Sequence, residues 1–95
     1  VLRYSKTEGA GMESERVLLA KVIGEQIVSL RKDKNIRQED LAKMSGLEQR
    51  SLRRIEKGLI SVTAYSLRRV LQALDEDVTI FWKKVEKNME VMGEK

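Results

Sequence analysis

Apolar residues recur along this 95-residue chain at the spacing of amphipathic helices. The first predicted helix begins after Ser14, a good N-cap residue, and runs to about Lys34. Gly24 in the middle of this helix indicates close packing against a neighbour, because glycine costs a helix about 1 kcal/mol relative to alanine. Asn35 suits the left-handed position that ends a helix. The inner face of the helix is predicted to be Leu19, Ile23, Ile27 and Leu30.

Three shorter helices are predicted in the middle of the chain. The first spans about 38–44 and the second about 49–57, with a tight turn at Gly46 between them and Gly58 as the final cap. The third begins after the cap residue Thr63 and runs to about Leu74. Its inward residues are predicted to be Leu67, Val70, Leu71 and Leu74, while Arg68 and Arg69 form its solvated face.

The last predicted helix, 77–92, carries its apolar residues within about 100° of arc. Its front half (Val78, Phe81 and Trp82) is predicted to pack in the core of the domain. Its back half extends beyond what a small domain easily covers, so it is predicted to join a second copy. Intramolecular packing of the whole stripe is the alternative. The residues assigned to dimerisation, with Trp82 at the boundary, are Trp82, Val85, Met89 and Met92.

Composition narrows the possible chemistry. The chain contains no His and no Cys, which excludes disulfides, thiol-ligated metal sites and imidazole chemistry, so no metal or cofactor is expected. No apolar run approaches the length of a membrane span and no secretory signal is present, which predicts a soluble cytoplasmic protein. Residues 1–13 lack helical periodicity and are predicted to form a flexible arm.

The net charge of +4 is placed unevenly. Segments 17–32 and 46–58 hold the whole excess, and the second of them is the predicted helix with Leu52 and Ile55 on one side. The opposite side of that helix carries Arg50, Arg53, Arg54 and Lys57. A solvated face is the simple explanation of such a cluster. Its position directly after a short helix and a glycine turn favours a surface for a polyanion instead.

The segment RQEDLAKMSGLEQRSLRRIEKG, with Ala42 at the helix crossing and Gly46 in the turn, resembles the Cro/cI-type (XRE) helix-turn-helix family. The resemblance extends over about 23–74. It implies an all-α, five-helix lambda-repressor-like DNA-binding domain, here with an extended C-terminal amphipathic helix. The expected organisation is the arm 1–13, a helix-turn-helix domain 14–76, and a C-terminal helix 77–95 for core packing and dimerisation.

The resemblance also implies roles for individual residues. Gln38 would contact a DNA phosphate, and the helix 48–57 would lie in the major groove. Gln49, Arg50 and Arg54 would read bases, since the Arg fork matches guanine and Gln matches adenine. Arg31 and Glu56 would form a structural ion pair. The full set expected to touch DNA is Gln38, Gln49, Arg50, Ser51, Arg53, Arg54 and Lys57.

Three features depart from the family pattern. Arg37 stands where a capping Ser, Thr or Asn is usual, and a guanidinium cannot accept the capping bond. Glu48 replaces the usual Ser or Thr at the start of the third helix and brings a negative charge close to the DNA. The loop 59–63 is apolar where the family often has a basic loop, which indicates either weaker contact with the DNA backbone or a surface for a partner.

The sequence therefore predicts a sequence-specific double-stranded DNA-binding protein that acts as a homodimeric transcriptional regulator, as a repressor. The alternative is a protein-binding module on the same fold, such as an antitoxin or adaptor, that uses the loop 59–62 and the terminal stripe. An enzyme is not predicted, because no nucleophile, base and orienting group form a recognisable constellation.

Overall fold

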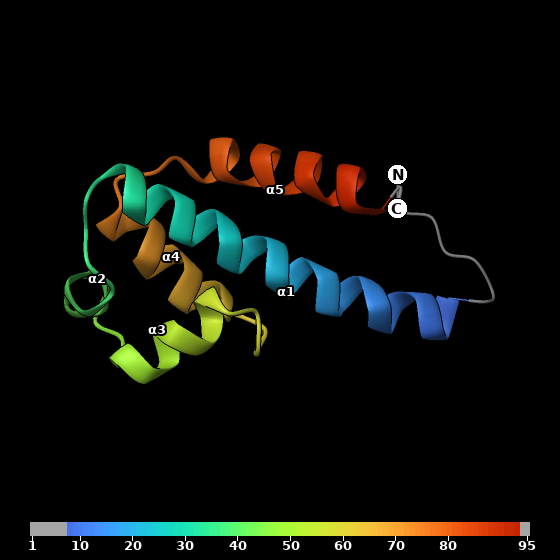
Figure 1. Ribbon diagram of the computed structural model, residues 1–95, viewed down its shortest axis with the longest axis horizontal. Coiled ribbons are helices and arrows are strands. Elements are labelled where there is room, and N and C mark those ends of the chain that lie inside the picture. The colour runs from blue at the N-terminus through green and yellow to red at the C-terminus, as the bar shows by residue number, and fades with distance from the viewer. Residues whose placement is uncertain (1–7, 94–95) are drawn as a thin grey trace.

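The computed structural model describes residues 8–93 and contains five helices and no strand within that range (Figure 1). The all-α, five-helix prediction is confirmed. In chain order the helices are α1 (Glu8–Asp33), α2 (Gln38–Ser45), α3 (Gln49–Glu56), α4 (Ala64–Ala73) and α5 (Val78–Gly93). None of the helices in the described range has the length and apolarity that crossing a membrane requires.

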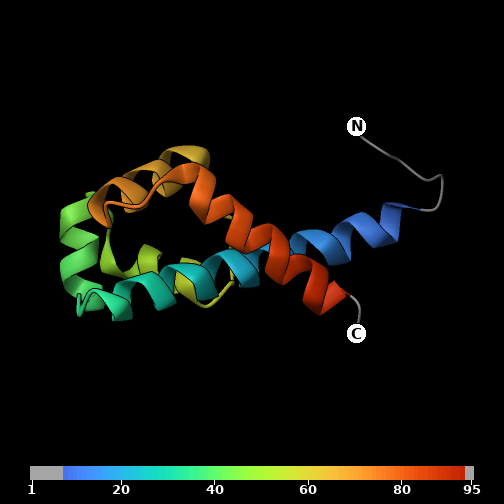
Figure 2. The same cartoon turned by 90° about the horizontal axis from the view of Figure 1, so that it is seen from above.

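The long helix α1 is the support on which the other helices are placed. Helices α2, α3 and α4 gather around its C-terminal half, and α5 runs back along it in the opposite direction (Figure 1). Seen from above, α5 crosses α1, and the N-terminal part of α1 extends beyond the other helices (Figure 2). The helix-turn-helix pair is thus held at one end of the molecule, on the side away from α5.

The start of α1 differs from the prediction. The helix begins at Glu8 and includes Ser14, so Ser14 is not its N-cap. Glu13 and Arg16 stand three residues apart and form an ion pair at 2.9 Å, which supports the helical conformation through this region. The predicted arm 1–13 is therefore helical from Glu8 onward, and its first part, 1–7, lies outside the described residues.

Four helices end with the same backbone device. A residue in the left-handed region follows each of them, and the next N–H donates to a carbonyl five residues back, which satisfies the last free carbonyls. The prediction for Asn35 is confirmed, with a φ of 57°. Gly58 must also be glycine for space, because an added Cβ would lie 2.7 Å from the Cα of Lys21. The four left-handed residues are Asn35, Gly46, Gly58 and Asp75.

Helix α4 begins as predicted. The hydroxyl of Thr63 accepts a hydrogen bond from the backbone N–H of Ser66 at 3.0 Å. Asp77 does the same for α5, since its carboxylate accepts from the N–H of Ile80 at 3.1 Å. Both caps satisfy a donor that the first helical turn leaves free.

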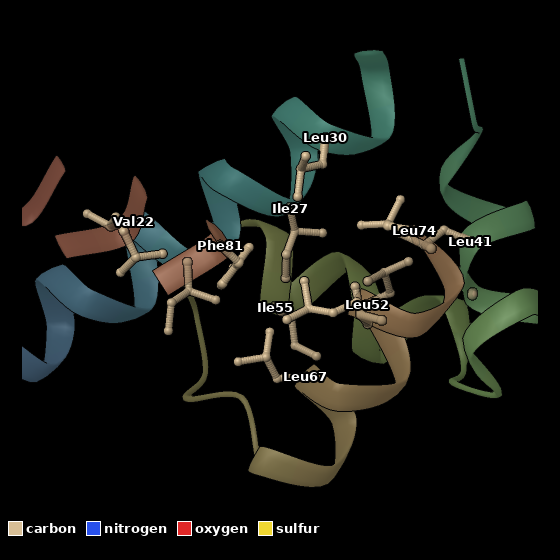
Figure 3. Packing of buried hydrophobic residues seen from close by; sticks show 14 residues of the cluster. Val22, Ile27, Leu30, Leu41, Leu52, Ile55, Leu67, Leu74 and Phe81 are labelled. Carbon is tan, nitrogen blue, oxygen red and sulfur yellow. The ribbon is translucent and has the colours of Figure 1, made fainter. Parts of the chain in front are cut away.

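One core joins all five helices (Figure 3). Side chains from α1, α3 and α4 point toward one another around Ile27, Ile55 and Leu67, and α5 adds Phe81 from the other side. Full burial of an aliphatic or aromatic side chain contributes roughly 1.5–3 kcal/mol each. The buried apolar residues are Val22, Ile23, Ile27, Leu30, Leu41, Ala42, Leu52, Ile55, Leu67, Val70, Leu71, Leu74, Phe81 and Val85.

The position of each residue along α5 corrects two predictions. Val85, assigned to dimerisation, is fully buried in the core of its own chain, and Val78, assigned to the core, is 52% exposed. Val78 lies on the same apolar arc as Phe81 and Val85, so its exposure comes from its place in the first turn of α5, one turn before the buried Phe81, and not from the rotation of the helix. Trp82 and Met89 pack partly against the core, and Met92 is exposed.

Candidate nucleic-acid interface

The corner between α2 and α3 is closed by small and aliphatic side chains. Leu41, Ala42 and Leu52 are buried at the crossing of the two helices. Gly46 takes a φ of 75° after α2, and the N–H of Leu47 donates to the carbonyl of Ala42 at 2.9 Å. This bond redirects the chain within three residues, so that α3 leaves the corner with its polar side turned to solvent.

Gly24 lets α3 approach α1 closely, as its place in the sequence predicted. A Cβ at this position would lie 2.5 Å from the backbone oxygens of both Ile55 and Glu56. The end of α3 therefore rests directly on the backbone of α1.

A polar network fixes α3 from the other side. Arg31 donates from Nε to Glu56 Oε2 at 2.8 Å and from Nη2 to Oε1 at 3.1 Å, which is the bidentate form of the expected ion pair. Its third nitrogen donates to the carbonyl of Ile36 at 3.0 Å. Gln38 adds a bond that sequence reasoning missed, from Nε2 to Glu56 Oε1 at 2.9 Å. The three helices α1, α2 and α3 thus share the Glu56 carboxylate.

Gln38 also links the beginning of α3 to the network. Its Oε1 accepts from Gln49 Nε2 at 3.5 Å, a long contact. An amide nitrogen has two protons, and only one of those on Gln38 is used within the chain as described. The second proton makes no hydrogen bond within the described residues.

The open side of α3 carries the predicted cations. The side chains of Gln49, Arg50, Arg53, Arg54 and Lys57 are exposed, and Ser51 is half-buried. None of the ion pairs in the described part of the chain involves any cation of α3. Unpaired cations on a rigid helix keep their full attraction for a polyanion, because no internal carboxylate has to be displaced first.

Neither of the two unusual cap positions caps its helix. Neither Arg37 before α2 nor Glu48 before α3 makes a side-chain capping bond, although both have the extended backbone of an N-cap. Arg37 instead pairs with Asp40 at 3.1 Å and with Glu39 at 3.4 Å. The hydrogen bond to Asp40 and the attraction of both carboxylates raise the pKa of Arg37.

Arg69 corrects the prediction of a fully solvated face on α4. It is half-buried, and its Nε donates to the carbonyl of Ser45 at 3.0 Å. The bond caps the C-terminus of α2, where a cation is favourable. Nothing in the local sequence marks this residue, since its partner lies on another helix. Arg68 is exposed, as predicted.

Comparison with known families identifies the pair of helices. A model of the helix-turn-helix family matches residues 27–81, more than half of the chain. The chain belongs to the helix-turn-helix family of Cro/cI type. This family consists of transcriptional regulators without enzymatic activity. No curated protein is similar enough in sequence to count as a relative.

Solved structures support the same family assignment. The clp gene regulator ClgR from Corynebacterium glutamicum is 25% identical, with a TM-score of 0.75 over 79% of this chain and 80% of ClgR. The wild-type restriction-modification controller protein C.Esp1396I is 28% identical, with a TM-score of 0.68 over 73% of this chain and 88% of the controller. A tyrosine variant of that controller, bound to its highest-affinity operator site, is 26% identical, with a TM-score of 0.71 over 76% of this chain and 95% of the controller. The chain therefore has the fold of helix-turn-helix DNA-binding regulators.

Residues 8–93 hold no group of acidic side chains arranged to bind a metal ion.

Proposed function

We propose that this chain is a homodimeric repressor that binds specific double-stranded DNA with α3 in the major groove. The observation that carries the proposal is the exposed, unpaired basic side of α3, held in place by the Gly24 contact and the Glu56 network. Rigid support matters because a base-reading side chain must be held to within about 0.5 Å of its productive position.

In this arrangement some polar residues of α3 contact base edges and others contact phosphates. Gln49, Arg50 and Arg54 read base edges, while Ser51 and Arg53 contact phosphates. Lys57, at the end of α3, adds a further phosphate contact. Gln38 donates its free amide proton to a phosphate of the DNA backbone. A dimer seated across a promoter excludes polymerase, and repression is the outcome we propose.

Dimerisation is best supported by a hollow beside the loop that follows α3. This hollow, of about 390 Å³, lies between α1, the loop before α4, α4 and the start of α5, and its lining is mainly apolar. Val78 and Trp82 line it from α5, and Val62 lines it from the loop. In the same loop, Leu59 is 69% exposed. We call this region the loop surface; it comprises Leu59, Ile60, Val62, Val78 and Trp82.

A second copy is the partner that suits the loop surface. The loop follows α3 directly, so a two-fold axis that passes through this surface perpendicular to the DNA would place both α3 helices on one side of the dimer. Successive major grooves on one side of DNA lie about 34 Å apart, and a near-palindromic site would present two half-sites at that spacing. Trp82 thus stays in the dimer contact, and Val78 takes the place that the sequence assigned to Val85.

The DNA-binding proposal predicts the behaviour of an Arg50→Ala/Arg54→Ala variant. Purified wild-type protein should enrich an inverted repeat from random and genomic fragments at two salt concentrations. The double variant should lose the repeat, because each bidentate Arg–guanine contact provides about 1–3 kcal/mol of discrimination. Arg54→Ala alone should relax the preference at one base pair.

Lys83→Ala/Lys87→Ala is the matched control for charge, since it removes two exposed cations from α5, away from α3. It should leave the recovered sequence unchanged. If the wild type binds all DNA sequences equally and loses this binding as salt is raised, the proposal is wrong. The cations of α3 would then attract DNA only through charge.

The dimer surface has a control within the same helix. Val78 and Ile80 are 52% and 50% exposed, and only Val78 lines the hollow. Val78→Lys should weaken the dimer by about 2 kcal/mol, because the contact would then bury a charge. Ile80→Lys should leave it unchanged, with both measured by sedimentation equilibrium. A dimer that survives Val78→Lys but not Met92→Lys would place the contact at the end of α5 instead.

The loop surface also supports a second candidate, a protein-binding module such as an antitoxin or adaptor. The exposed Leu59 and Ile60 stand where a DNA-contacting loop would be basic. Such a protein can repress its own operon as well. Monomeric wild-type protein that forms a stoichiometric complex with the product of a neighbouring gene would favour this candidate over the homodimer.

A further inference from the structure

Glu48 is an acidic side chain at the start of the proposed DNA-reading helix, and within residues 8–93 its carboxylate forms no ion pair and no capping bond. It is the N-cap residue of α3, with φ −70° and ψ 142°, yet its carboxylate makes no capping bond. The side chain is exposed and belongs to none of the ion pairs in the described residues. Its carboxylate is therefore free to meet a ligand.

The neighbours of Glu48 explain why no internal partner takes the carboxylate. On a helix, a side chain reaches residues three and four positions on, and here these are Ser51 and Leu52. Leu52 is buried and Ser51 carries no charge. The nearest cation along α3, Arg50, is two positions away, where side chains do not face each other. The charge of Glu48 still interacts favourably with the positive N-terminal end of the α3 dipole, and that interaction leaves both carboxylate oxygens available to a ligand.

We propose that Glu48 reads a cytosine by accepting a hydrogen bond from its N4 amino group. The inference rests on the proposed DNA-binding function and adds the base specificity of one position. The first residues of the second helix in a helix-turn-helix reach the base edges. Cytosine N4 is the major-groove donor that Glu and Asp typically accept from. Adenine N6 is also a donor, but the N7 acceptor beside it repels a carboxylate, and guanine presents only acceptors in this groove.

The charge of Glu48 makes this contact selective. Facing guanine O6 and N7 or thymine O4, the carboxylate meets only acceptor atoms, and it is repelled by phosphates on every sequence. Specificity then arises partly from rejection of the wrong base, which lowers affinity for unrelated DNA. The negative charge of Glu48 thus lowers the affinity for unrelated DNA that the cations Arg50, Arg53, Arg54 and Lys57 provide.

The test is selection from a random DNA library by the wild type, Glu48→Gln and Glu48→Ala. The wild type should recover a C·G pair at one position of each half-site. Glu48→Ala should lose about 10-fold or more in discrimination at that pair while its affinity for unrelated DNA rises several-fold. Glu48→Gln should shift the preferred base toward adenine, which glutamine reads.

Glu39→Ala is the matched control, because Glu39 is an acidic residue in the first turn of α2 that pairs with Arg37. It should raise affinity for all sequences without changing the recovered site. If Glu48→Ala behaves in the same way and keeps the C·G pair, the inference is wrong and the DNA-binding proposal stands. If the wild type recovers no sequence at all, both fail. Circular dichroism of each variant checks that the overall helix content is unchanged.

Discussion

Glu56→Ala is expected to lower the free energy of unfolding by about 3–5 kcal/mol. The Glu56 side chain is 4% exposed, and its carboxylate receives two bonds from Arg31 and one from Gln38. Alanine would leave a guanidinium that is 13% exposed without its counter-charge, and an amide without its acceptor. Since domains of this size are stable by about 5–15 kcal/mol, a large share of the total would be lost. Urea unfolding followed by circular dichroism measures the change.

Two controls separate the effect of burying the Arg31–Glu56 pair from the effect of losing one charge. Glu13→Ala breaks an ion pair between the same residue types, with side chains 64% and 65% exposed, and it should cost less than about 1 kcal/mol. Arg31→Met/Glu56→Met removes both charges at once and should recover most of the stability lost in Glu56→Ala. Equal losses in Glu13→Ala and Glu56→Ala would show that the network contributes little to the fold.

Gly24→Ala should destabilise the protein by about 3 kcal/mol, the upper end of the range for overpacking. The added Cβ would stand 2.5 Å from two backbone oxygens at the end of α3, and backbone cannot turn aside as a flexible side chain can. Helices α1 and α3 would have to separate. The loss should appear despite a gain of about 1 kcal/mol in helix propensity. Thermal unfolding should show a fall in Tm of about 15 °C.

Ser29→Ala provides the comparison, because Ser29 is exposed on the same helix. Its substitution should leave stability the same or raise it slightly, since only propensity changes. Gly24→Ala should also weaken specific DNA binding in the fraction that remains folded, because the contact sets the distance of α3 from α1. An unchanged Tm would mean that α3 can shift outward freely, and the rigid-support argument would then be wrong.

The sequence by itself determined the helices and most of their ends. The spacing of apolar residues predicted five helices, and Thr63 and Asn35 marked a beginning and an end that the structure confirms. It also placed the cations of α3 opposite Leu52 and Ile55. These features depend on residues a few positions apart, and local spacing is enough to define them.

The structure alone decided which part of each apolar face is covered and which distant groups meet. The apolar arc of α5 was visible in the sequence, but its crossing with α1 decided that Val85 is buried and Val78 is not. The bonds from Gln38 to Glu56 and from Arg69 to Ser45 join residues 18 and 24 positions apart. A helix wheel gives the direction of a side chain relative to its own axis. Which neighbour it meets depends on the crossing of two axes, and that is set only when the whole core packs.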